Sequence, residues 1–169
     1  GAGSSGGGSP WIQFGGGGGS GGYMECIIPR PASGVTSITV GAGGHPVPAG
    51  FQAHGNAGGE TSVGSECIAY GSPLGGQHAY GPSTGGDGGS GGYGRGRDTW
   101  ISIPGGQGDA SPPQMNGVNI TFPRGANAPM GATGGNNWQM GLTPGGGGAP
   151  GNSQYPSGVG GDGWIDIYW

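Results

Sequence analysis

The feature that most constrains the fold is the glycine-rich run at residues 15–22, GGGGGSGG. Glycine has no side chain to bury and loses more backbone entropy on ordering than any other residue, so such a run is ordered only where backbone hydrogen bonds compensate that loss. Similar runs recur along the chain, which holds 51 glycines and 15 prolines among 169 residues. The chain is therefore either a flexible polymer or a scaffold built from backbone contacts.

The remaining composition favours the ordered scaffold. Disordered chains are poor in aromatic residues and rich in charge, whereas this chain has 5 Trp, 6 Tyr and 3 Phe with only 7% charged residues. A strict Gly-X-Y repeat is absent, which excludes a collagen triple helix. The ordered alternative is polyglycine II, an extended left-handed helix with three residues per turn. Glycine keeps its N–H, so neighbouring helices of this kind can hydrogen-bond sideways and form a bundle.

Short apolar runs bounded by glycine or proline, several of them alternating, predict short β-strands. Glycine and proline are the poorest helix formers, so we expect almost no helix. Pro29, Pro31 and Gly34 predict a hairpin between the second and third runs. The predicted fold class is mostly β and irregular: a bundle of polyglycine II helices with short β-strands, long loops and essentially no α-helix. The runs are residues 11–14, 23–28, 35–40, 66–70, 99–103, 118–122 and 164–169.

The length and the even composition predict one glycine-rich domain over residues 1–169. Residues 95–140, which are richer in proline and aromatic residues, are expected to form a variable, loop-rich insert. A three-residue turn places every third side chain on one edge of a helix. We therefore expect Ser20, Asp87 and Ser90 to point outward while the glycines contact neighbouring helices.

The sequence lacks the residues that several classes of function require. With four arginines, no lysine and a net charge of −4, the chain is a poor candidate for nucleic-acid binding. No apolar run is long enough to span a membrane. No strand-to-helix turn is available for a nucleophile elbow, no P-loop motif is present, and the cysteines and histidines lack zinc-site spacing. We expect neither an enzyme nor a cofactor or metal site. Cys26 and Cys67 form either a disulfide, as in an extracellular protein, or two separate buried thiols.

Two segments carry a family resemblance. Residues 37–44, SITVGAGG, and residues 58–64, GGETSVG, resemble the glycine-rich domain of many bacteriophage tail-fibre and tail-tip proteins. Residues 1–8 with 15–22 are similar to its opening polyglycine block, and residues 160–168 to its closing strand. The chain also resembles the receptor-binding tip adhesins of long tail fibres, in which stacked polyglycine helices carry variable loops. The resemblance implies a location in the virion or outside the cell, with a bacterial surface protein or glycan and the rest of the tail fibre as partners.

The aromatic residues cannot all be buried in a scaffold of glycine. We expect Trp164 and Trp169 to pack over strands, and others to serve in loops as rigid anchors for a receptor or to cap open edges of the bundle. The loops we expect to bind are residues 45–54, 77–83, 95–100, 111–115 and 126–140. The candidate receptor-binding residues are Phe51, Tyr80, Tyr93, Arg95, Arg97, Trp100 and Trp138.

Two other functions are compatible with this composition. The first is a structural glycine-rich domain of a self-assembling extracellular fibre or filament, for example a homotrimer, with Trp and Tyr at the subunit contacts. The second is an ice-binding protein, since some of these use glycine-rich bundles of extended helices. Ice binding needs a flat, regular face of small residues, and the bulky inserts speak against it.

Overall fold

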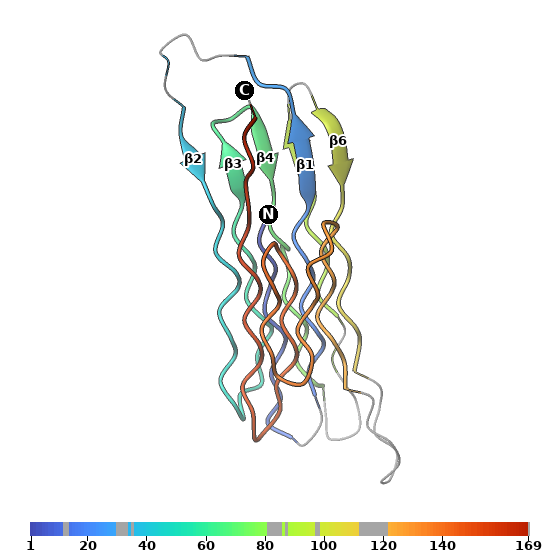
Figure 1. The fold of residues 1–169 in the computed structure, drawn as a ribbon. Helices are drawn as coiled ribbons and strands as arrows, with labels where there is room; N and C mark the ends of the chain where they lie inside the picture. Colours follow the sequence, from blue (N-terminus) through green and yellow to red (C-terminus); the bar gives the residue numbers. More distant parts are fainter. Residues whose placement is uncertain are drawn as a thin grey trace.

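Two small antiparallel sheets occupy one end of the elongated molecule, and winding extended segments run lengthwise from them to the other end, as the computed structural model shows (Figure 1). We call these the strand end and the loop end. The structure describes residues 1–11, 14–29, 34, 36–80, 86, 88–96, 99–111 and 122–168, except the side chains of Thr99 and Trp100. Within these ranges there is no α-helix, and the predicted class, mostly β and irregular, is confirmed.

The two sheets differ in size. The two-stranded sheet pairs β1 (Tyr23–Cys26) with β6 (Thr99–Ile103). The other sheet has the order β2-β3-β4-β5, and its strands are β2 (Ile38–Thr39), β3 (Thr61–Val63), β4 (Cys67–Ala69) and β5 (Gly94–Gly96). A disulfide between Cys26 of β1 and Cys67 of β4 joins the two sheets across a sequence separation of 41 residues. Of the two alternatives for the cysteines, the structure therefore contains the disulfide.

Residues 2–8 form the central helix of the bundle, and their backbone hydrogen bonds repeat every three residues. Each of three successive N–H groups donates to a different neighbouring segment, and the pattern then starts again. This repeat is what a helix with three residues per turn requires. Ala2, Ser5 and Gly8 donate to residues 59, 56 and 53; Gly3 and Gly6 donate to residues 161 and 158; and Ser4 and Gly7 donate to residues 19 and 16.

The carbonyl groups of the same helix accept from three further directions. Ala2, Ser5 and Gly8 accept from Ser72, Gly76 and Ala79, Ser4 and Gly7 accept from Gly148 and Gly151, and Gly3 accepts from Gly44. The central helix is thus bonded on all sides by six segments that are distant in sequence. The N–O distances of its donated bonds are 2.8–3.4 Å. The predicted bundle of polyglycine II helices is therefore present.

Residues 15–22 form a second buried helix beside the first, so the run is a scaffold element and not a linker. Gly15, Gly18 and Gly21 donate to Gly151, Gly148 and Gly145, again with a period of three. A methyl group at Gly17 would lie 1.9 Å from the carbonyl oxygen of Arg124. The backbones approach too closely for any side chain at this position.

The interior is made mostly of backbone and small polar side chains. Among the described residues, its large apolar members are Phe14 and Val47, whereas the fully buried side chains include Ser4, Ser20 and Ser72. Ser4 Oγ lies 2.8 Å from Ser72 Oγ and accepts from the Gly19 N–H at 2.9 Å. Hydroxyl groups thus replace some of the lateral backbone hydrogen bonds.

The prediction that Ser20 points outward was wrong. Ser20 is fully buried, and its Oγ accepts a hydrogen bond from the Gly106 N–H at 2.7 Å. Its helix has neighbours on every edge, so the three-residue period offers it no outward position. Ser90 is half-buried, and Asp87 lies outside the described residues.

The predicted hairpin between residues 23–28 and 35–40 was also wrong. The first run contains β1 and the second contains β2, but β1 pairs with β6 and β2 with β3. The hairpin that exists joins β3 to β4 through Gly64, whose φ is +55°. Neither β3 nor β5 was predicted, because TSV and GRG carry almost no apolar signal.

Two further expectations need correction. Residues 164–168 pair with no described strand, and Trp164 is 61% exposed instead of packed over the sheet; Trp169 lies outside the described residues. The expected loop-rich insert, residues 95–140, contributes to the bundle over much of its described length. Gly108 donates to Gly89, and Ala126 donates to Gly18.

A pair of glycine substitutions tests the close packing. We expect Gly17→Ala to lower the free energy of unfolding by about 3 kcal/mol or more, because the rigid neighbouring carbonyl cannot move away. The matched control is Gly106→Ala, where the added carbon meets nothing closer than 3.2 Å. This variant should stay within about 1 kcal/mol of the parent. Chemical unfolding followed by tryptophan fluorescence measures both, and equal stability of the two variants would contradict the bundle packing.

The disulfide between the sheets gives a second prediction. Closing a loop of 41 residues stabilises the chain by about 4 kcal/mol in the chain-entropy model. The double variant Cys26→Ser/Cys67→Ser should lose about this much unfolding free energy, and so should the parent in reducing buffer. Reductant should leave the double variant unchanged. A parent whose denaturation midpoint does not respond to reductant would contradict the prediction.

Candidate functional site

Two of the predicted binding loops, residues 45–54 and 77–83, meet in the structure; residues 81–83 lie outside the described part. Their segments lie on neighbouring helices, where the Gly55 N–H donates to Gly76 O at 2.8 Å. Both segments are also bonded to the central helix, through the Ala53 carbonyl and the Ala79 N–H to Gly8. The bundle therefore fixes the spacing between the two loops.

The three-residue period determines which side chains of residues 74–80 face outward. Gly76 and Ala79 are buried and donate to the central helix. Leu74, Gln77 and Tyr80 share the opposite edge, and Leu74 and Tyr80 are 64% and 53% exposed. On the neighbouring segment, Phe51 and His54 are likewise three residues apart and exposed.

A row of three rings runs across the two segments. The ring centroids of His54 and His78 are 4.6 Å apart, and those of His78 and Tyr80 are 4.9 Å apart. We call these three residues the ring row. The Tyr80 hydroxyl donates to Gln77 Oε1, and His78 Nδ1 lies 3.0 Å from Ala79 O. The amide nitrogen of Gln52 also lies 3.4 Å from His78 Nδ1, so the second loop segment contacts the same ring.

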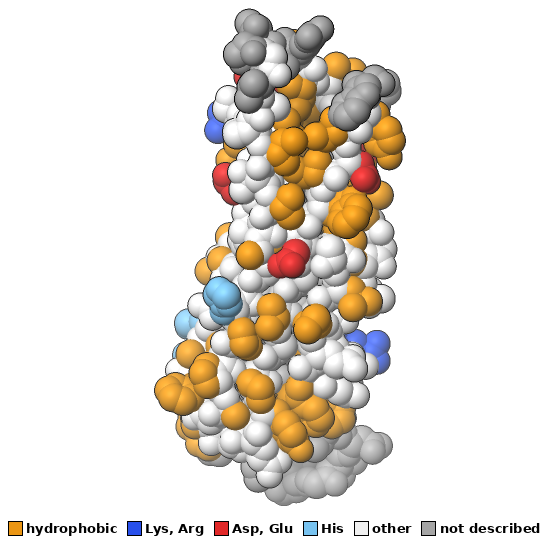
Figure 2. All heavy atoms as spheres, turned by 60° about the vertical axis from the view of Figure 1, so that its left-hand side comes forward, with side chains coloured by type: hydrophobic (Ala, Val, Ile, Leu, Met, Phe, Trp, Pro, Cys, Tyr) orange, Lys and Arg blue, Asp and Glu red, His pale blue; other side chains and the backbone are white. Residues whose placement is uncertain are grey.

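A hollow of about 580 Å³ lies beside the ring row. Its lining includes His54, Leu74, Gln77, Tyr80, Ser90 and Gln107. None of the lining residues is Asp, Glu, Lys or Arg. In the space-filling view, apolar side chains gather near both ends of the molecule, and histidine side chains lie in the lower half beside one of these groups (Figure 2). In the described part of the chain, this surface combines exposed rings and amide groups with a hollow whose lining residues carry no formal charge.

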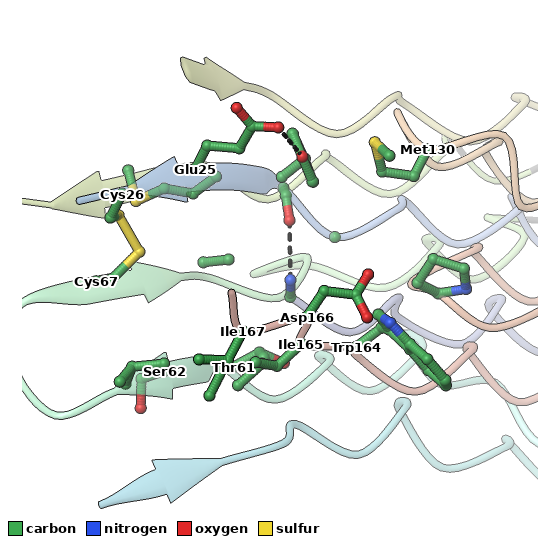
Figure 3. A pocket seen from close by; sticks show the side chains of 18 of the residues that line it. Glu25, Cys26, Thr61, Ser62, Cys67, Met130, Trp164, Ile165, Asp166 and Ile167 are labelled. Carbon is green, nitrogen blue, oxygen red and sulfur yellow. Dashed lines mark hydrogen bonds between the residues drawn. A yellow bond between two sulfur atoms is a disulfide. The ribbon is translucent and has the colours of Figure 1, made fainter. Parts of the chain in front are cut away.

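A larger groove of about 1530 Å³ lies at the strand end. β1 contributes Glu25 and Cys26, β3 contributes Thr61 and Ser62, and residues 164–167 run beside β3 and β4 (Figures 1 and 3). The apolar residues around this end are well exposed: Ile27 is 61%, Ile38 53% and Ile167 45% accessible. The groove therefore leaves apolar surface uncovered.

Two groups in this groove have shifted pKa values. Burial lowers the pKa of the Gly1 α-amino group to about 6, although this group donates to Gly22 O at 2.8 Å. The hydrogen bond from the Tyr23 hydroxyl to Glu25 Oε1, at 2.5 Å, is the main cause that raises the pKa of Tyr23 to about 12. Tyr23 is thus neutral, and a donor, throughout the physiological range.

The other candidate residues lie away from the ring row. Tyr93 is 56% exposed, and its ring centroid lies 4.6 Å from that of Tyr70, while Arg95 is exposed on β5. Trp100 belongs to β6 at the strand end, but its side chain is not described, and Arg97 lies outside the described residues. The structure therefore brings Phe51 and Tyr80 to one surface and places Tyr93, Arg95 and Trp100 at the strand end.

Trp138 packs as part of an aromatic cluster. It stacks on Tyr155 with a centroid distance of 4.1 Å, and contacts Phe14 and Phe122 at 6.2 and 5.7 Å. Its Nε1 is buried and has no hydrogen-bond partner among the described residues. Trp138 thus follows the alternative role considered for the aromatic residues, which is to cap the bundle.

Sequence reasoning missed the partners of Phe51 and Tyr80. His54, Gln77 and His78 lie in loops that were expected to bind but were not selected as candidate residues, although a three-residue period applied to Leu74, Gln77 and Tyr80 gives one shared edge. Within the described ranges, no group of three or more His, Cys, Asp and Glu residues could hold a metal ion. No helix in the same ranges has the length and apolar character needed to span a membrane.

Comparison with known proteins gives one assignment. No curated protein matches the chain. A family model described as a glycine-rich domain matches residues 1–169, which is the whole sequence. The bundle of glycine helices, the small sheets and this match agree, and the chain belongs to the glycine-rich domain family.

Proposed function

We propose that this chain is a tail-fibre tip or adhesin-like domain of a bacteriophage that binds a receptor on the bacterial surface without catalysing a reaction. The observation that carries the proposal is the meeting of two predicted loops, which brings the rings of His54, His78 and Tyr80 together, with exposed Phe51 on the same segment as His54. The resemblance of residues 37–44 and 58–64 to phage tail-fibre domains supports the same function. The disulfide suits a location in the virion or outside the cell.

The bundle suits this role because it orders the binding residues in advance. The segments on either side of the hollow are hydrogen-bonded to each other and to the central helix. Side chains on such a support lose little freedom when a receptor binds, and this loss is a main cost of association. Exposed tyrosine and phenylalanine provide large contact area with few rotatable bonds.

Binding of the purified, fluorescently labelled chain to a panel of bacterial strains tests this function. We expect saturable binding to some strains, and block of adsorption of phages that infect them. The double variant Phe51→Ala/Tyr80→Ala should bind those strains at least about tenfold more weakly, because exposed aromatic anchors carry much of the energy of such contacts. Tyr168→Ala, which removes a tyrosine that is 91% exposed at the strand end, is the matched control. Absence of binding to every strain, or full binding by the double variant, would refute the proposal.

A second candidate function, assembly into a homotrimer or longer fibre, is favoured by the strand end. Exposed Ile27, Ile38 and Ile101 lie there together with an extended terminal segment, residues 164–168. No backbone N–H of that segment donates to a described backbone carbonyl. Extended backbone with free hydrogen-bonding groups, together with exposed apolar side chains, favours the addition of a strand from another copy of the chain.

Sedimentation velocity measures this assembly. We expect the parent chain to sediment as an oligomer at tens of micromolar, and the variant Ile27→Ser/Ile101→Ser to sediment as a monomer. Leu74→Ser, which changes a 64% exposed apolar residue away from the strand end, should leave the oligomer intact. A parent chain that remains a compact monomer at high concentration would rule assembly out.

A further inference from the structure

We infer that the ring row and the hollow beside it bind a neutral sugar ring of a bacterial surface glycan. This inference rests on the proposed receptor-binding function and specifies its ligand. The two segments supply the rings of His54, His78 and Tyr80, the apolar side chain of Leu74 and the amide group of Gln77. A third segment, after β6, adds the amide group of Gln107 to the lining of the hollow.

The exposed rings suit the apolar face of a sugar. Several C–H bonds of a pyranose point to one side of the ring, and their slightly positive hydrogens are attracted to the negative face of an aromatic system. Tyr80 is 53% exposed, and its hydroxyl is tied to Gln77 Oε1, so its ring is held in place before a ligand arrives. Leu74, on the same helix edge and 64% exposed, extends the apolar surface at the other end of the hollow.

The polar groups suit the hydroxyls of a sugar. Each sugar hydroxyl both donates and accepts, and a primary amide offers both functions in one plane. Gln77 uses its Oε1 to accept from Tyr80, which leaves its NH₂ group as a donor, and Gln107 and Ser90 line the same hollow. The Tyr80 oxygen still has acceptor capacity, since it acts there as a donor. The lining therefore combines hydrogen-bond donors and acceptors with the apolar side chain of Leu74 and the ring of Tyr80.

The charge of the site selects among ligands. The lining residues include no Arg or Lys to pair with a carboxylate or phosphate, and the whole chain has a net charge of −4. Acidic and phosphorylated sugars would lose hydration without gaining a counter-charge, whereas a neutral hexose or N-acetylhexosamine meets no such cost. A hollow of about 580 Å³ is also within the size range of small-molecule sites.

Saturation-transfer NMR with simple glycosides tests this inference directly. The neutral probes are the methyl glycosides of glucose, galactose and N-acetylglucosamine, and the matched charged probes are glucuronate and glucose 6-phosphate. At least one neutral glycoside should show transfer to its ring protons with a dissociation constant of about 1 mM, the strength expected of so small a ligand. The two charged probes should bind at least about fivefold more weakly.

Substitutions at the ring row and the hollow test whether the glycoside binds there. Tyr80→Ala and Gln77→Ala should each weaken binding of the responding glycoside at least about fivefold, and Tyr80→Phe, which keeps the ring, should weaken it less. Tyr168→Ala should have no effect, and unfolding curves check that every variant is folded. Absence of transfer from all three neutral glycosides, equal binding of the charged probes, or an unaffected Tyr80→Ala would each overturn the inference.

Cell binding separates this inference from the proposed function on which it rests. If the ligand is a glycan, periodate oxidation of the bacterial surface should abolish binding of the chain, and protease treatment should not. Binding that resists periodate and is lost after protease would indicate a protein receptor, which overturns the sugar inference and leaves receptor binding intact. Absence of binding to untreated cells of every strain would refute both.

Discussion

The structure depends on the lateral hydrogen bond between a backbone N–H of one three-residue helix and a backbone carbonyl of its neighbour. In the central helix these bonds leave in every direction, with Ala2, Gly3 and Ser4 donating to three separate segments. One such bond contributes only about 1 kcal/mol net, but a bundle contains dozens of them. Because they require backbones to approach within van der Waals contact, positions such as Gly17 admit no side chain. The bundle replaces most of an apolar core with its own main chain.

This constraint explains why the sequence predicts the type of fold, a polyglycine bundle, better than it predicts which helices and strands are neighbours. The glycine content and the lack of helix formers are sufficient to predict a polyglycine bundle, and residues 99–103 match β6 because apolar side chains mark that strand. Lateral backbone bonds carry no side-chain information, so the partners of a given glycine helix cannot be read from the sequence. The same reason explains the wrong hairpin, since the pairing of β1 with β6 follows from where the glycine helices place the strands. Ser20 shows the same limit. Whether its side chain points inward depends on which segments surround it, and the sequence pattern does not identify those segments.

The candidate site was predicted in part for a similar reason. Phe51 and Tyr80 could be selected because a glycine bundle has room inside for few bulky side chains, such as Phe14, and both are exposed. That their segments lie side by side could not be predicted, since it depends on the hydrogen bond between Gly55 and Gly76 of two adjacent helices. Trp138 satisfies the same rule by covering Phe14 and Phe122 at the surface of the bundle. The size of a side chain therefore favours an exterior position but does not distinguish a binding residue from a capping one.

The three-residue period of the helices shows which positions can carry a large side chain. A helix in the interior has neighbours on every edge, so each of its positions must be small, as in residues 2–8. A helix at the surface has a free edge, and every third position on it can carry a large side chain. Leu74, Gln77 and Tyr80 follow this rule, with Gly76 and Ala79 on the buried side. Because the free edge is the one part of the helix that packing does not restrict, its side chains can change without disturbing the bundle. A glycine scaffold thus combines a strictly constrained interior with surface positions on which binding specificity can vary.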